Sequence, residues 1–469
     1  MSLHARQTPN KLAVVFEGKA TTYGQLMKDV ESASAFFSKQ LGNSQQKVVA
    51  LVITNSTDFI VTHLAVLHAG HITMPLDPAF KRLEIDAILD QLKPAMLVAH
   101  QDYSDKFSRH SDIKTFDLSK IMQPSDDKSI KRLRLEPDKQ IATITFTSGT
   151  SGVPKGVPNT HANHAWNIYT CSKVWGWTSD DSLLLNLPLS HMHGLVIGLS
   201  GCVYHGNTLY LHQQSFDTEA VLKTLASGKI SLFTHGPIAY MKMLETSKSY
   251  DISQVRLFIS GSAPLPPSLW KEFKKRYKVE IIETYGTSET GRIAGNSPTE
   301  KRLGTPGRPM PGVKVRFTDR GEIEVKSDGV FPGYWNNPAA TAKTRAADGY
   351  WRTGDIGELK AGYIYLKGRV QERIRKFGHT VSPRDVEWAL LENPSVKEAY
   401  VMGLQNNSGP NDQIVYFIAG DISDAELNDY CKANLPFSWR PDRIVLLKNL
   451  PRTKNGKPHL KKMKEMASA

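Results

Sequence analysis

A short stretch rich in hydroxyl groups and glycines, with one lysine, is the first candidate for chemistry. Residues 147–156 read TSGTSGVPKG and follow the alternating apolar run IATITF. Gly149, Gly152 and Gly156 allow backbone N–H groups to approach an anion closely, while the hydroxyls and Lys155 add donors and positive charge. This combination predicts a loop that binds the phosphates of a nucleotide.

The loop does not have the spacing of a Walker A motif, which requires G-x-x-x-x-G-K-[ST]. Here Val153 and Pro154 separate Gly152 from Lys155, and Lys155 is followed by Gly156 instead of a metal-binding hydroxyl. The sequence therefore disfavours a kinase or ATPase of the P-loop class.

Further segments accompany the loop in order along nearly the whole chain. They are LPLSHMHGL (187–195), ISGSAPLP (259–266), ETYGTSETG (283–291), VFPGYW (330–335), YWRTGDIG (350–357), GRVQERIRKFGHTVSPRDVE (368–387) and PRTKNGK (451–457). Together with the loop they resemble the motifs of the adenylate-forming superfamily, which includes acyl-CoA synthetases, luciferases and adenylation domains of peptide synthetases. Within it, the chain is most similar to acyl-CoA synthetases of the malonyl-CoA and 4-coumarate-CoA ligase types.

The resemblance implies an ATP-dependent acid:CoA ligase that uses ATP, Mg²⁺ and CoA. A carboxylate attacks ATP to give acyl-AMP and pyrophosphate, and the CoA thiol then takes the acyl group. Two anions must meet in the first step, so fixed positive charge is needed at the α-phosphate. By resemblance Lys457 bridges the two anions, Glu289 binds Mg²⁺ directly or through water, and His191 lies between the acid and thiol sites.

The same resemblance implies the nucleotide contacts. Tyr285 packs against adenine, Asp355 accepts hydrogen bonds from the ribose hydroxyls, and Arg369 helps to hold ribose or phosphate. Ser288 stands where many relatives carry threonine and keeps a hydroxyl for the α-phosphate. The expected ATP or AMP contacts are Thr147, Ser148, Gly149, Thr150, Ser151, Gly152, Lys155, Gly261, Ser262, Ala263, Glu283, Thr284, Tyr285, Gly286, Thr287, Ser288, Asp355, Arg369 and Arg375.

The identity of the acid does not follow from the sequence, because the segments expected to line its pocket share no single character. The expected pocket residues are His193, His235, Gly236, Thr287 and Arg292. Arg292 is open to two interpretations. It could pair with a second carboxylate of a small dicarboxylic acid, or it could be an exposed loop arginine.

Two positions are expected to serve the movement between the half-reactions. Gln371 lies at the hinge position, where relatives commonly carry Lys or Asp, and a hinge needs only to absorb backbone rotation. Gly378 is expected in the CoA tunnel, because a pantetheine arm requires close backbone approach. The resemblance implies that the C-terminal unit rotates so that Lys457 serves adenylation and the loop near Gly378 serves thioester formation.

The elements that must position these residues alternate in the first third of the chain. Residues 47–53 and 95–100 form apolar runs typical of buried strands, and residues 55–70 predict a capped amphipathic helix between them. After about residue 313, strand-like segments between Gly and Asp turns predict a β-rich subdomain. In the last hundred or so residues Ser382, Pro383 and Asp385 predict a helix start with a capping box.

These patterns predict a mixed α/β and α+β fold. We expect a large N-terminal domain of stacked α/β sheets over residues 1–368, whose β-rich subdomain covers about residues 313–368. A small mobile α+β domain over residues 369–469 would follow.

Composition limits the setting. The chain has 59 Lys and Arg against 46 Asp and Glu, a net charge of +13 that would attract phosphorylated small molecules, nucleic acid or membrane surfaces. The basic residues are scattered, which favours solvated faces. Cys171, Cys202 and Cys431 are far apart and suggest neither a metal site nor a disulfide framework. Polar residues interrupt the most apolar stretch, residues 183–204, so no membrane span is expected, and a cytoplasmic location fits best.

Two alternatives remain open at this point. An adenylation enzyme that loads a carrier-protein thiol or another nucleophile would share the motifs, although the freestanding format and the HMHG segment favour free CoA. A noncatalytic nucleotide sensor or a nucleic-acid-binding protein would explain the charge and the loop, but not the presence of Lys457, Glu289 and Asp355 in their motifs. The expected partners are therefore a small carboxylic acid, ATP and CoA, without nucleic acid.

Overall fold

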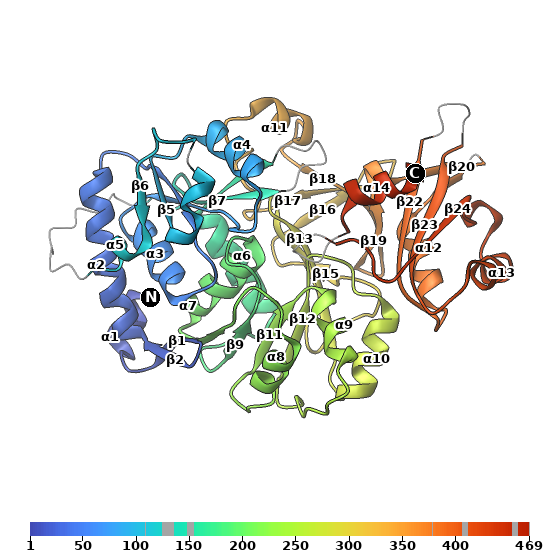
Figure 1. Ribbon diagram of the computed structural model, residues 1–469, viewed down its shortest axis with the longest axis horizontal. Coiled ribbons are helices and arrows are strands. Elements are labelled where there is room, and N and C mark those ends of the chain that lie inside the picture. The colour runs from blue at the N-terminus through green and yellow to red at the C-terminus, as the bar shows by residue number, and fades with distance from the viewer. Residues whose placement is uncertain are drawn as a thin grey trace.

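The computed structural model describes residues 1–107, 109–123, 136–147, 154–377, 379–405, 411–452 and 458–468. Two α/β sheets form most of the N-terminal part, a smaller antiparallel sheet follows, and a separate group of strands and helices ends the chain (Figure 1). This arrangement is the predicted combination of stacked α/β sheets, a β-rich part and a small α+β part.

The N-terminal sheet is parallel except at one edge, where its last two strands form a hairpin. Its order is β6 (Thr115–Asp117), β5 (Met96–Ala99), β3 (Val48–Val52), β4 (Ile72–Pro75), β7 (Ile141–Thr147) and β8 (Lys155–Thr160). Strand β3 reads VVALV and is buried throughout, as expected for a strand covered on both faces.

The central sheet is parallel from β13 through β1 and antiparallel at both ends. Its order is β15 (Arg308–Pro309), β14 (Gly291–Gly295), β13 (Ile281–Thr287), β12 (Leu257–Ser260), β11 (Leu232–His235), β9 (Ser182–Leu185), β10 (Thr208–Leu211), β1 (Leu12–Phe16) and β2 (Lys19–Thr22). The carboxyl ends of β11, β12 and β13 therefore lie side by side.

Helices separate and cover the two sheets. One hydrophobic core joins strands of both sheets through α2 (Tyr23–Leu41), α3 (Thr57–His68), α6 (His161–Trp175) and the π-helix η2 (His193–Ser200). On the outer faces, α8 (Thr218–Leu225), α9 (Pro237–Glu245) and α10 (Pro267–Tyr277) cover the central sheet, and α4 (Arg82–Leu92) and η1 (Gln101–Phe107) cover the N-terminal sheet. Shorter helices are α1 (Ser2–Gln7), α5 (Leu118–Ile121) and α7 (Gly201–His205).

The position of α3 corrects one expectation. The helix has its predicted cap, since the Ser56 hydroxyl accepts a hydrogen bond from the Phe59 N–H, but it is not amphipathic. Residues 59–63 are buried without interruption, because the helix lies between two sheets, and none of its residues is fully exposed.

The β-rich part is an antiparallel sheet of β16 (Lys314–Phe317), β17 (Glu322–Lys326), β18 (Trp351–Lys360) and β19 (Tyr363–Arg369), with α11 (Pro338–Thr344) beside β18. Asp355 and Arg369 are opposite each other in the β18–β19 register. This pairing brings two of the expected nucleotide-binding residues together at one end of the hairpin.

The C-terminal unit, as described from η3 onward, has hydrophobic cores of its own. It contains η3 (Val370–Glu372), β20 (Ile374–Lys376), β21 (His379–Val381), α12 (Pro383–Leu391), β22 (Val396–Leu404), β23 (Gln413–Gly420), α13 (Asp424–Asn434), η4 (Phe437–Trp439), β24 (Arg443–Leu447) and α14 (Leu460–Ser468). Separate cores support the boundary that we place between residues 368 and 369, which stays a prediction.

The capping box expected at α12 is only half formed. The Ser382 hydroxyl accepts a hydrogen bond from the Asp385 N–H, as predicted. The Asp385 carboxylate instead lies 3.4 Å from Lys367 Nζ of β19. A contact between distant elements has thus replaced the local one. No helix in the described residues is long and apolar enough to cross a membrane.

Several buried histidines and glutamates have shifted pKa values, and these shifts make the free energy of unfolding depend on pH. His63 in α3 is fully buried, and neither ring nitrogen has a hydrogen-bond partner among the described residues. Burial lowers the pKa of His63 to about 3, and burial lowers that of His164 to about 3 as well. Conversely, burial raises the pKa of the carboxyls of Glu283 and Glu387 to about 7.

We expect the free energy of unfolding to fall steeply below about pH 4.5. Between pH 6.5 and about 3, the unfolded chain binds protons at His63 and His164 that the folded chain does not bind. Each group then lowers stability by up to about 1.4 kcal/mol per pH unit as the pH decreases. Between about pH 7 and 4.5, Glu283 and Glu387 are protonated in the folded chain but not in the unfolded chain, so they raise stability as the pH falls and offset the loss from the histidines. Below pH 4.5 the unfolded chain binds these protons as well, and the offset ends.

Denaturant unfolding measured from about pH 8 to 3.5 checks this dependence. The substitution His63→Leu removes one of the protons and should flatten the acid limb, whereas His459→Gln, at an exposed histidine of the C-terminal unit, should not. The explanation is wrong if the acid slope of His63→Leu equals that of the unmodified protein.

Candidate active site

Most expected site residues gather where three strands of the central sheet end. His235 closes β11, Ser260 closes β12, and residues 284–287 form the last part of the neighbouring β13, with Ser288 directly after it. Because these strands are parallel, their carboxyl ends share one edge of the sheet, where ligands bind in open α/β folds. The hairpins β7–β8 and β18–β19 bring residues of two other sheets to the same region.

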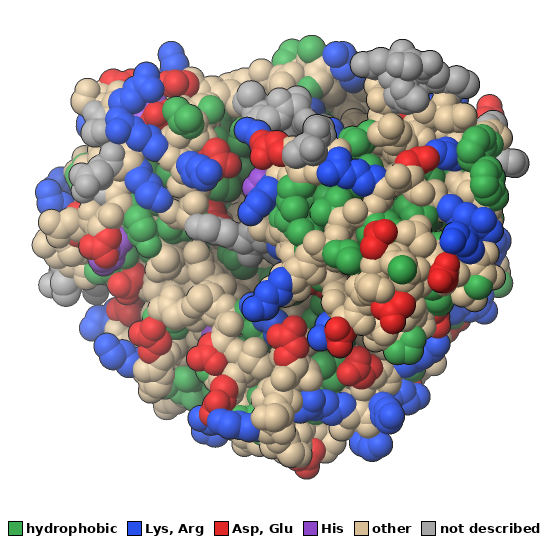
Figure 2. Space-filling view, turned by 45° about the vertical axis from the view of Figure 1, so that its right-hand side comes forward, with side chains coloured by type: hydrophobic (Ala, Val, Ile, Leu, Met, Phe, Trp, Pro, Cys, Tyr) green, Lys and Arg blue, Asp and Glu red, His purple; other side chains and the backbone are tan. Residues whose placement is uncertain are grey.

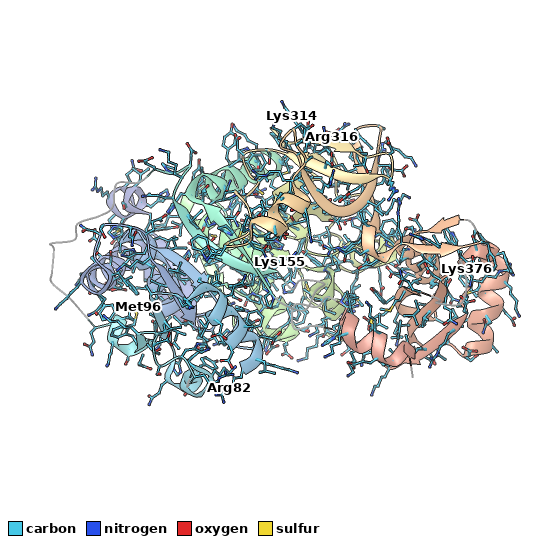
Figure 3. All side chains as sticks on the ribbon, turned by 90° about the horizontal axis from the view of Figure 1, so that it is seen from above. Arg82, Met96, Lys155, Lys314, Arg316 and Lys376 are labelled. Carbon is cyan, nitrogen blue, oxygen red and sulfur yellow. The ribbon has the colours of Figure 1, made fainter. Side chains whose placement is uncertain are left out.

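The β7–β8 hairpin carries Lys155 opposite Thr147. Lys155 Nζ lies 5.0 Å from the centre of the Tyr334 ring, and the Tyr334 hydroxyl donates a 3.0 Å hydrogen bond to Glu289 Oε1. The Trp335 N–H donates to the Gly156 carbonyl at 2.9 Å and so fastens this segment to the hairpin. Lys155 lies in the middle of the molecule (Figure 3), and Tyr334 connects it to Glu289.

A second group of contacts joins the central sheet to the β18–β19 hairpin. The Tyr285 hydroxyl donates to Asp355 Oδ2 at 2.7 Å, and Arg369 Nε lies 3.1 Å from Asp355 Oδ1. Burial and the neighbouring Asp355 raise the pKa of Tyr285 well above its ordinary value, so its hydroxyl stays a donor. The structure thus brings together the three residues that were expected to hold adenine and ribose.

The histidine-containing segment is tied to the same region. Asn159 Nδ2 donates to the Met192 sulfur at 3.7 Å and lies 3.5 Å from the Ser288 carbonyl. His191 precedes Met192, is half-buried and lies two residues before the start of η2. Asn159 thus joins Met192, the neighbour of His191 in the chain, to the Ser288 segment.

Of the expected acid-pocket residues, His193, His235 and Arg292 lie close together on the other side of β13, whereas the Thr287 hydroxyl contacts that of Thr290. His193 contacts the Ser262 hydroxyl at 3.2 Å through Nδ1 and the Thr234 hydroxyl at 2.7 Å through Nε2. His235 Nδ1 accepts from the Gly236 N–H at 2.8 Å, so its proton resides on Nε2. Arg292 in β14 is buried, with an exposed fraction of 7%. The interpretation of Arg292 as an exposed loop residue is therefore wrong.

Glycines allow the strands to approach closely here. A Cβ added at Gly286 would lie 2.2 Å from the Gly291 carbonyl oxygen, and one added at Gly261 would lie 3.1 Å from His193 Cε1. Ser262 is held at φ +67°, a strained conformation for a residue with a side chain. Ala263 follows it half-buried. Strained backbone in such a place is typical of a binding site.

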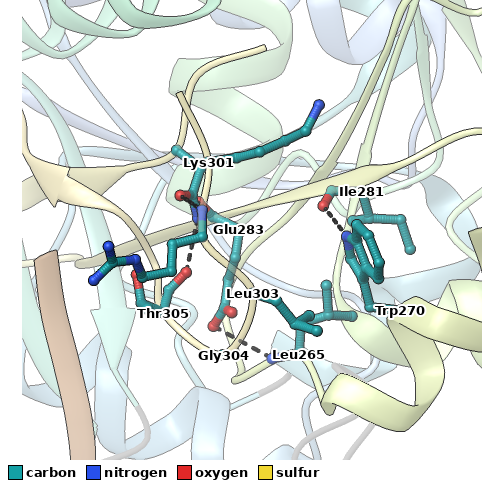
Figure 4. Close-up of a pocket in the computed structure, with 10 residues that line it drawn as sticks. Leu265, Trp270, Ile281, Glu283, Lys301, Leu303, Gly304 and Thr305 are labelled. Atoms are coloured by element: carbon teal, nitrogen blue, oxygen red, sulfur yellow. Dashed lines mark hydrogen bonds between the residues drawn. The ribbon is translucent and has the colours of Figure 1, made fainter. Parts of the chain in front are cut away.

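Glu283 of β13 was also an expected nucleotide contact, and it lines a separate cavity. Its Oε1 accepts a hydrogen bond from the Leu265 N–H at 3.3 Å and faces a cavity lined by Trp270 and Gly304 (Figure 4). The nearby positive charge of Arg384 in α12 lowers the carboxyl pKa less than burial raises it. Thr284 and Thr287 lie on the same strand, where the Thr284 hydroxyl donates to the Ala294 carbonyl at 2.9 Å.

The structure describes only some of the predicted site residues in the C-terminal unit. Gln371 is exposed in η3, between the β18–β19 hairpin and the C-terminal unit, which suits a hinge. The Arg375 N–H donates to Asp412 Oδ2 at 2.7 Å, and its side chain is exposed. The predicted residues Ser148, Gly149, Thr150, Ser151, Gly152, Gly378 and Lys457 lie outside the described residues.

Sequence reasoning missed residues that position the site. Tyr334 connects Lys155 to Glu289, yet within VFPGYW it carried no role. Asn159 holds the Met192 and Ser288 segments together, and its Oδ1 is buried without a partner among the described residues. Asn167 accepts a 2.8 Å hydrogen bond from the Arg292 N–H. No local pattern indicated these contacts, because each of them joins positions far apart in the sequence.

No group of three or more metal-binding side chains occurs in the part of the chain that the structure describes. Mg²⁺ does not need such a group, because it commonly takes one or two carboxylates together with water and substrate phosphates. Glu289 is half-buried beside Lys155, with its second oxygen not engaged by Tyr334. It therefore fits a magnesium ion that arrives with ATP.

Two family models match the chain. The model for the AMP-binding enzyme covers residues 1–335, and the model for the AMP-binding enzyme C-terminal domain covers residues 385–457. The first match spans the two α/β sheets and the Tyr334 segment, and the second spans most of the C-terminal unit.

Curated relatives match over nearly the full length. A 2-succinylbenzoate–CoA ligase of Listeria monocytogenes is 28% identical over 99% of this chain and 98% of its own. A malonate–CoA ligase of Arabidopsis thaliana is 26% identical over 98% of this chain and 87% of its own.

Solved structures share the fold. ATP-bound MatB from Rhodopseudomonas palustris superimposes with a TM-score of 0.92 at 26% identity, covering 99% of this chain and 98% of that one. The O-succinylbenzoate CoA synthetase MenE from Bacillus subtilis, in complex with ATP and a magnesium ion, gives a TM-score of 0.89 at 25% identity with the same coverage.

Proposed function

We propose that this chain, which belongs to the AMP-binding enzyme family, is an ATP-dependent acid:CoA ligase that forms an acyl-AMP intermediate. One carboxylate oxygen of the acid forms a bond to the α-phosphorus of ATP and pyrophosphate leaves. The CoA thiol then bonds to the acyl carbon, and AMP leaves with the oxygen that came from the acid. The observation that carries this proposal is the convergence of the Tyr285–Asp355–Arg369 and Lys155–Tyr334–Glu289 contacts at one sheet edge.

The nucleotide side follows from charge and donor placement. Asp355 is buried and keeps acceptor capacity beyond its contacts with Tyr285 and Arg369, so it can accept from ribose hydroxyls. The exposed guanidinium of Arg369 is free to turn toward phosphate, and Tyr285 offers a ring face for adenine. Lys155 supplies a cation next to the hairpin loop for the outer phosphates.

Glu289 would hold Mg²⁺, which when bound neutralises phosphate charge and polarises the phosphoryl group. Tyr334 orients the Glu289 carboxylate through its hydroxyl, while its ring contacts Lys155. We assign to Lys457 the remaining positive charge, between the acid carboxylate and the α-phosphate. His193 and Arg292 lie on the side of β13 opposite to Tyr285, where the acid would enter.

A pyrophosphate-release screen with short, long, aromatic and dicarboxylic acids tests the proposal, because each turnover of the first step liberates one pyrophosphate. We expect release that depends on the acid, and a thioester when CoA is added. The proposal fails if every acid leaves the rate at the level without acid.

Loading of a carrier-protein thiol is the second candidate, since it would use the same adenylation residues. Acyl-AMP that accumulates without turnover on CoA, but transfers to a phosphopantetheinyl carrier, would favour it. A role in nucleic-acid binding is not supported by the surface, because Lys and Arg are interspersed with Asp and Glu over the face in Figure 2.

We keep the cytoplasm as the proposed location, consistent with the buried free thiols of Cys171, Cys202 and Cys431.

A further inference from the structure

We propose that Arg292 binds a second carboxylate of the acid substrate, so that the enzyme activates dicarboxylic acids and leaves one carboxylate unreacted. This inference rests on the proposed function and names the substrate class of the same site. Its starting point is a buried positive charge for which the described residues provide no negative partner.

Arg292 is held firmly inside the protein. Every residue of β14, Gly291–Gly295, is buried, and the Arg292 N–H donates to Asn167 Oδ1 at 2.8 Å. Its Nη1 lies 3.3 Å from the point where a Cβ on Gly261 would be. Since Gly261 follows the end of β12, the guanidinium lies at the sheet edge where the site is built.

The surroundings of the guanidinium are neutral. No Asp or Glu oxygen of the described residues lies within 4.0 Å of it, whereas Arg256 pairs with Asp181 and Arg369 with Asp355. The Cys171 thiol lies next to the guanidinium, and burial raises the pKa of that thiol to about 12, so it is uncharged.

The histidine beside the guanidinium is neutral as well. Burial, reinforced by the positive charge of Arg292, lowers the pKa of His193 well below its ordinary value. Both ring nitrogens of His193 already contact the hydroxyls of Ser262 and Thr234. His193 therefore shapes the wall beside Arg292 and supplies no compensating charge.

A buried arginine cannot escape this situation by losing its proton, because its guanidinium stays charged in proteins. Burial of an unpaired charge is unfavourable, and a fork of parallel N–H donors matches a carboxylate in geometry as well as charge. An anionic group of a ligand would supply the missing partner.

Position distinguishes the acid from the nucleotide as the source of that anion. Successive side chains of a strand point to opposite faces. Tyr285 points to Asp355, on the nucleotide side of β13, whereas Thr284 Cγ2 lies 3.3 Å from the Gly261 Cβ position, as Arg292 Nη1 does. Arg292 thus faces away from the nucleotide contacts. An ATP molecule held on the Asp355 side keeps its phosphates away from Arg292, whereas a carboxylate of the acid can reach it.

The experiment compares acids of equal chain length that differ in one group, such as malonate with propanoate, succinate with butanoate and glutarate with pentanoate. The measured quantity is kcat/KM for pyrophosphate release. We expect the unmodified enzyme to prefer one of the diacids over its monoacid by about 10²-fold, because the monoacid leaves the buried cation unpaired. Arg292→Met should abolish that preference by lowering kcat/KM for the diacid.

Two further variants test whether the positive charge of Arg292 or the planar shape of its guanidinium matters, and whether losing any arginine has the same effect. Arg292→Lys keeps a charge without the planar fork and should retain an intermediate preference. Arg316→Met removes an arginine of β16 that pairs with Glu324 and Asp348 far from the site (Figure 3). This variant should leave the preference for the diacid unchanged.

A binding measurement covers the case of a poorly active variant. In the presence of a non-hydrolysable ATP analogue, the preferred diacid should raise the Tm of the unmodified protein but not that of Arg292→Met. Without ligand, Arg292→Met should unfold at the same or a higher temperature, because it removes an unpaired buried charge.

Equal kcat/KM for diacid and monoacid, with the same ratio in Arg292→Met, would overturn the role of Arg292 while leaving the ligase activity intact. Absence of pyrophosphate release with every acid would instead overturn the proposed function, and with it this inference.

Discussion

Replacing Lys457 with Ala should slow adenylation by about 10²–10³-fold while thioester formation from supplied acyl-AMP continues at a rate within a few-fold of the unmodified enzyme. In the proposed mechanism the first step brings a carboxylate and an α-phosphate together, and we assign to Lys457 the positive charge that offsets their repulsion. The second step joins a thiol to an acyl carbon, and we expect a different face of the C-terminal unit to serve it. Pyrophosphate release and thioester formation, assayed separately, measure the two effects.

Lys462→Ala provides the matched control for this prediction. Lys462 is an exposed lysine of α14, close in sequence to the PRTKNGK segment, and its loss changes the net charge equally. It should leave both half-reactions near their original rates. Equal losses in both half-reactions for Lys457→Ala would contradict a division of labour between two faces of the C-terminal unit.

The substitution Asp355→Asn should raise the KM for ATP by about 10–100-fold. Asp355 is buried and its two oxygens contact Tyr285 and Arg369, so a neutral amide loses the ion pair and one acceptor. Hydrogen bonds that involve a charged group contribute about 1.5–3 kcal/mol each, which sets this range. Steady-state kinetics with ATP as the varied substrate, together with calorimetric ATP titration, provide the measurement.

Asp348→Asn is the corresponding control, because Asp348 is an exposed carboxylate that pairs with Arg316 away from the site. It should leave the KM for ATP unchanged. If Asp355→Asn affected only the KM for the acid, the assignment of the Tyr285–Asp355–Arg369 contacts to the nucleotide would be wrong.

Local patterns predicted the elements well where local forces decide them. The apolar runs at residues 47–53 and 95–100 became β3 and β5 within one residue at each end. The amphipathic reading of α3 failed because burial on all sides depends on a second sheet that comes later in the chain. The capping box at α12 failed for a similar reason, since Lys367 of β19 takes the Asp385 carboxylate.

The site was predictable to the extent that short motifs carry it. Tyr285, Asp355 and Arg369 come from three segments, and the structure brings them into contact. The roles of Tyr334 and Asn159 were not predictable, because each connects positions far apart in sequence. The burial of Arg292 was likewise hidden, since its exposure depends on how β14 pairs with β13 under α6.

The path of the acid's oxygen tests the central claim most directly. With an acid labelled with ¹⁸O in its carboxylate, turnover in the presence of ATP and CoA should place one ¹⁸O atom in AMP, because the carboxylate oxygen bonds to the α-phosphorus and stays there when the thiol takes the acyl group. Mass spectrometry of the AMP formed measures it. Unlabelled AMP accompanying thioester formation would contradict an acyl-AMP intermediate and the function proposed for this site.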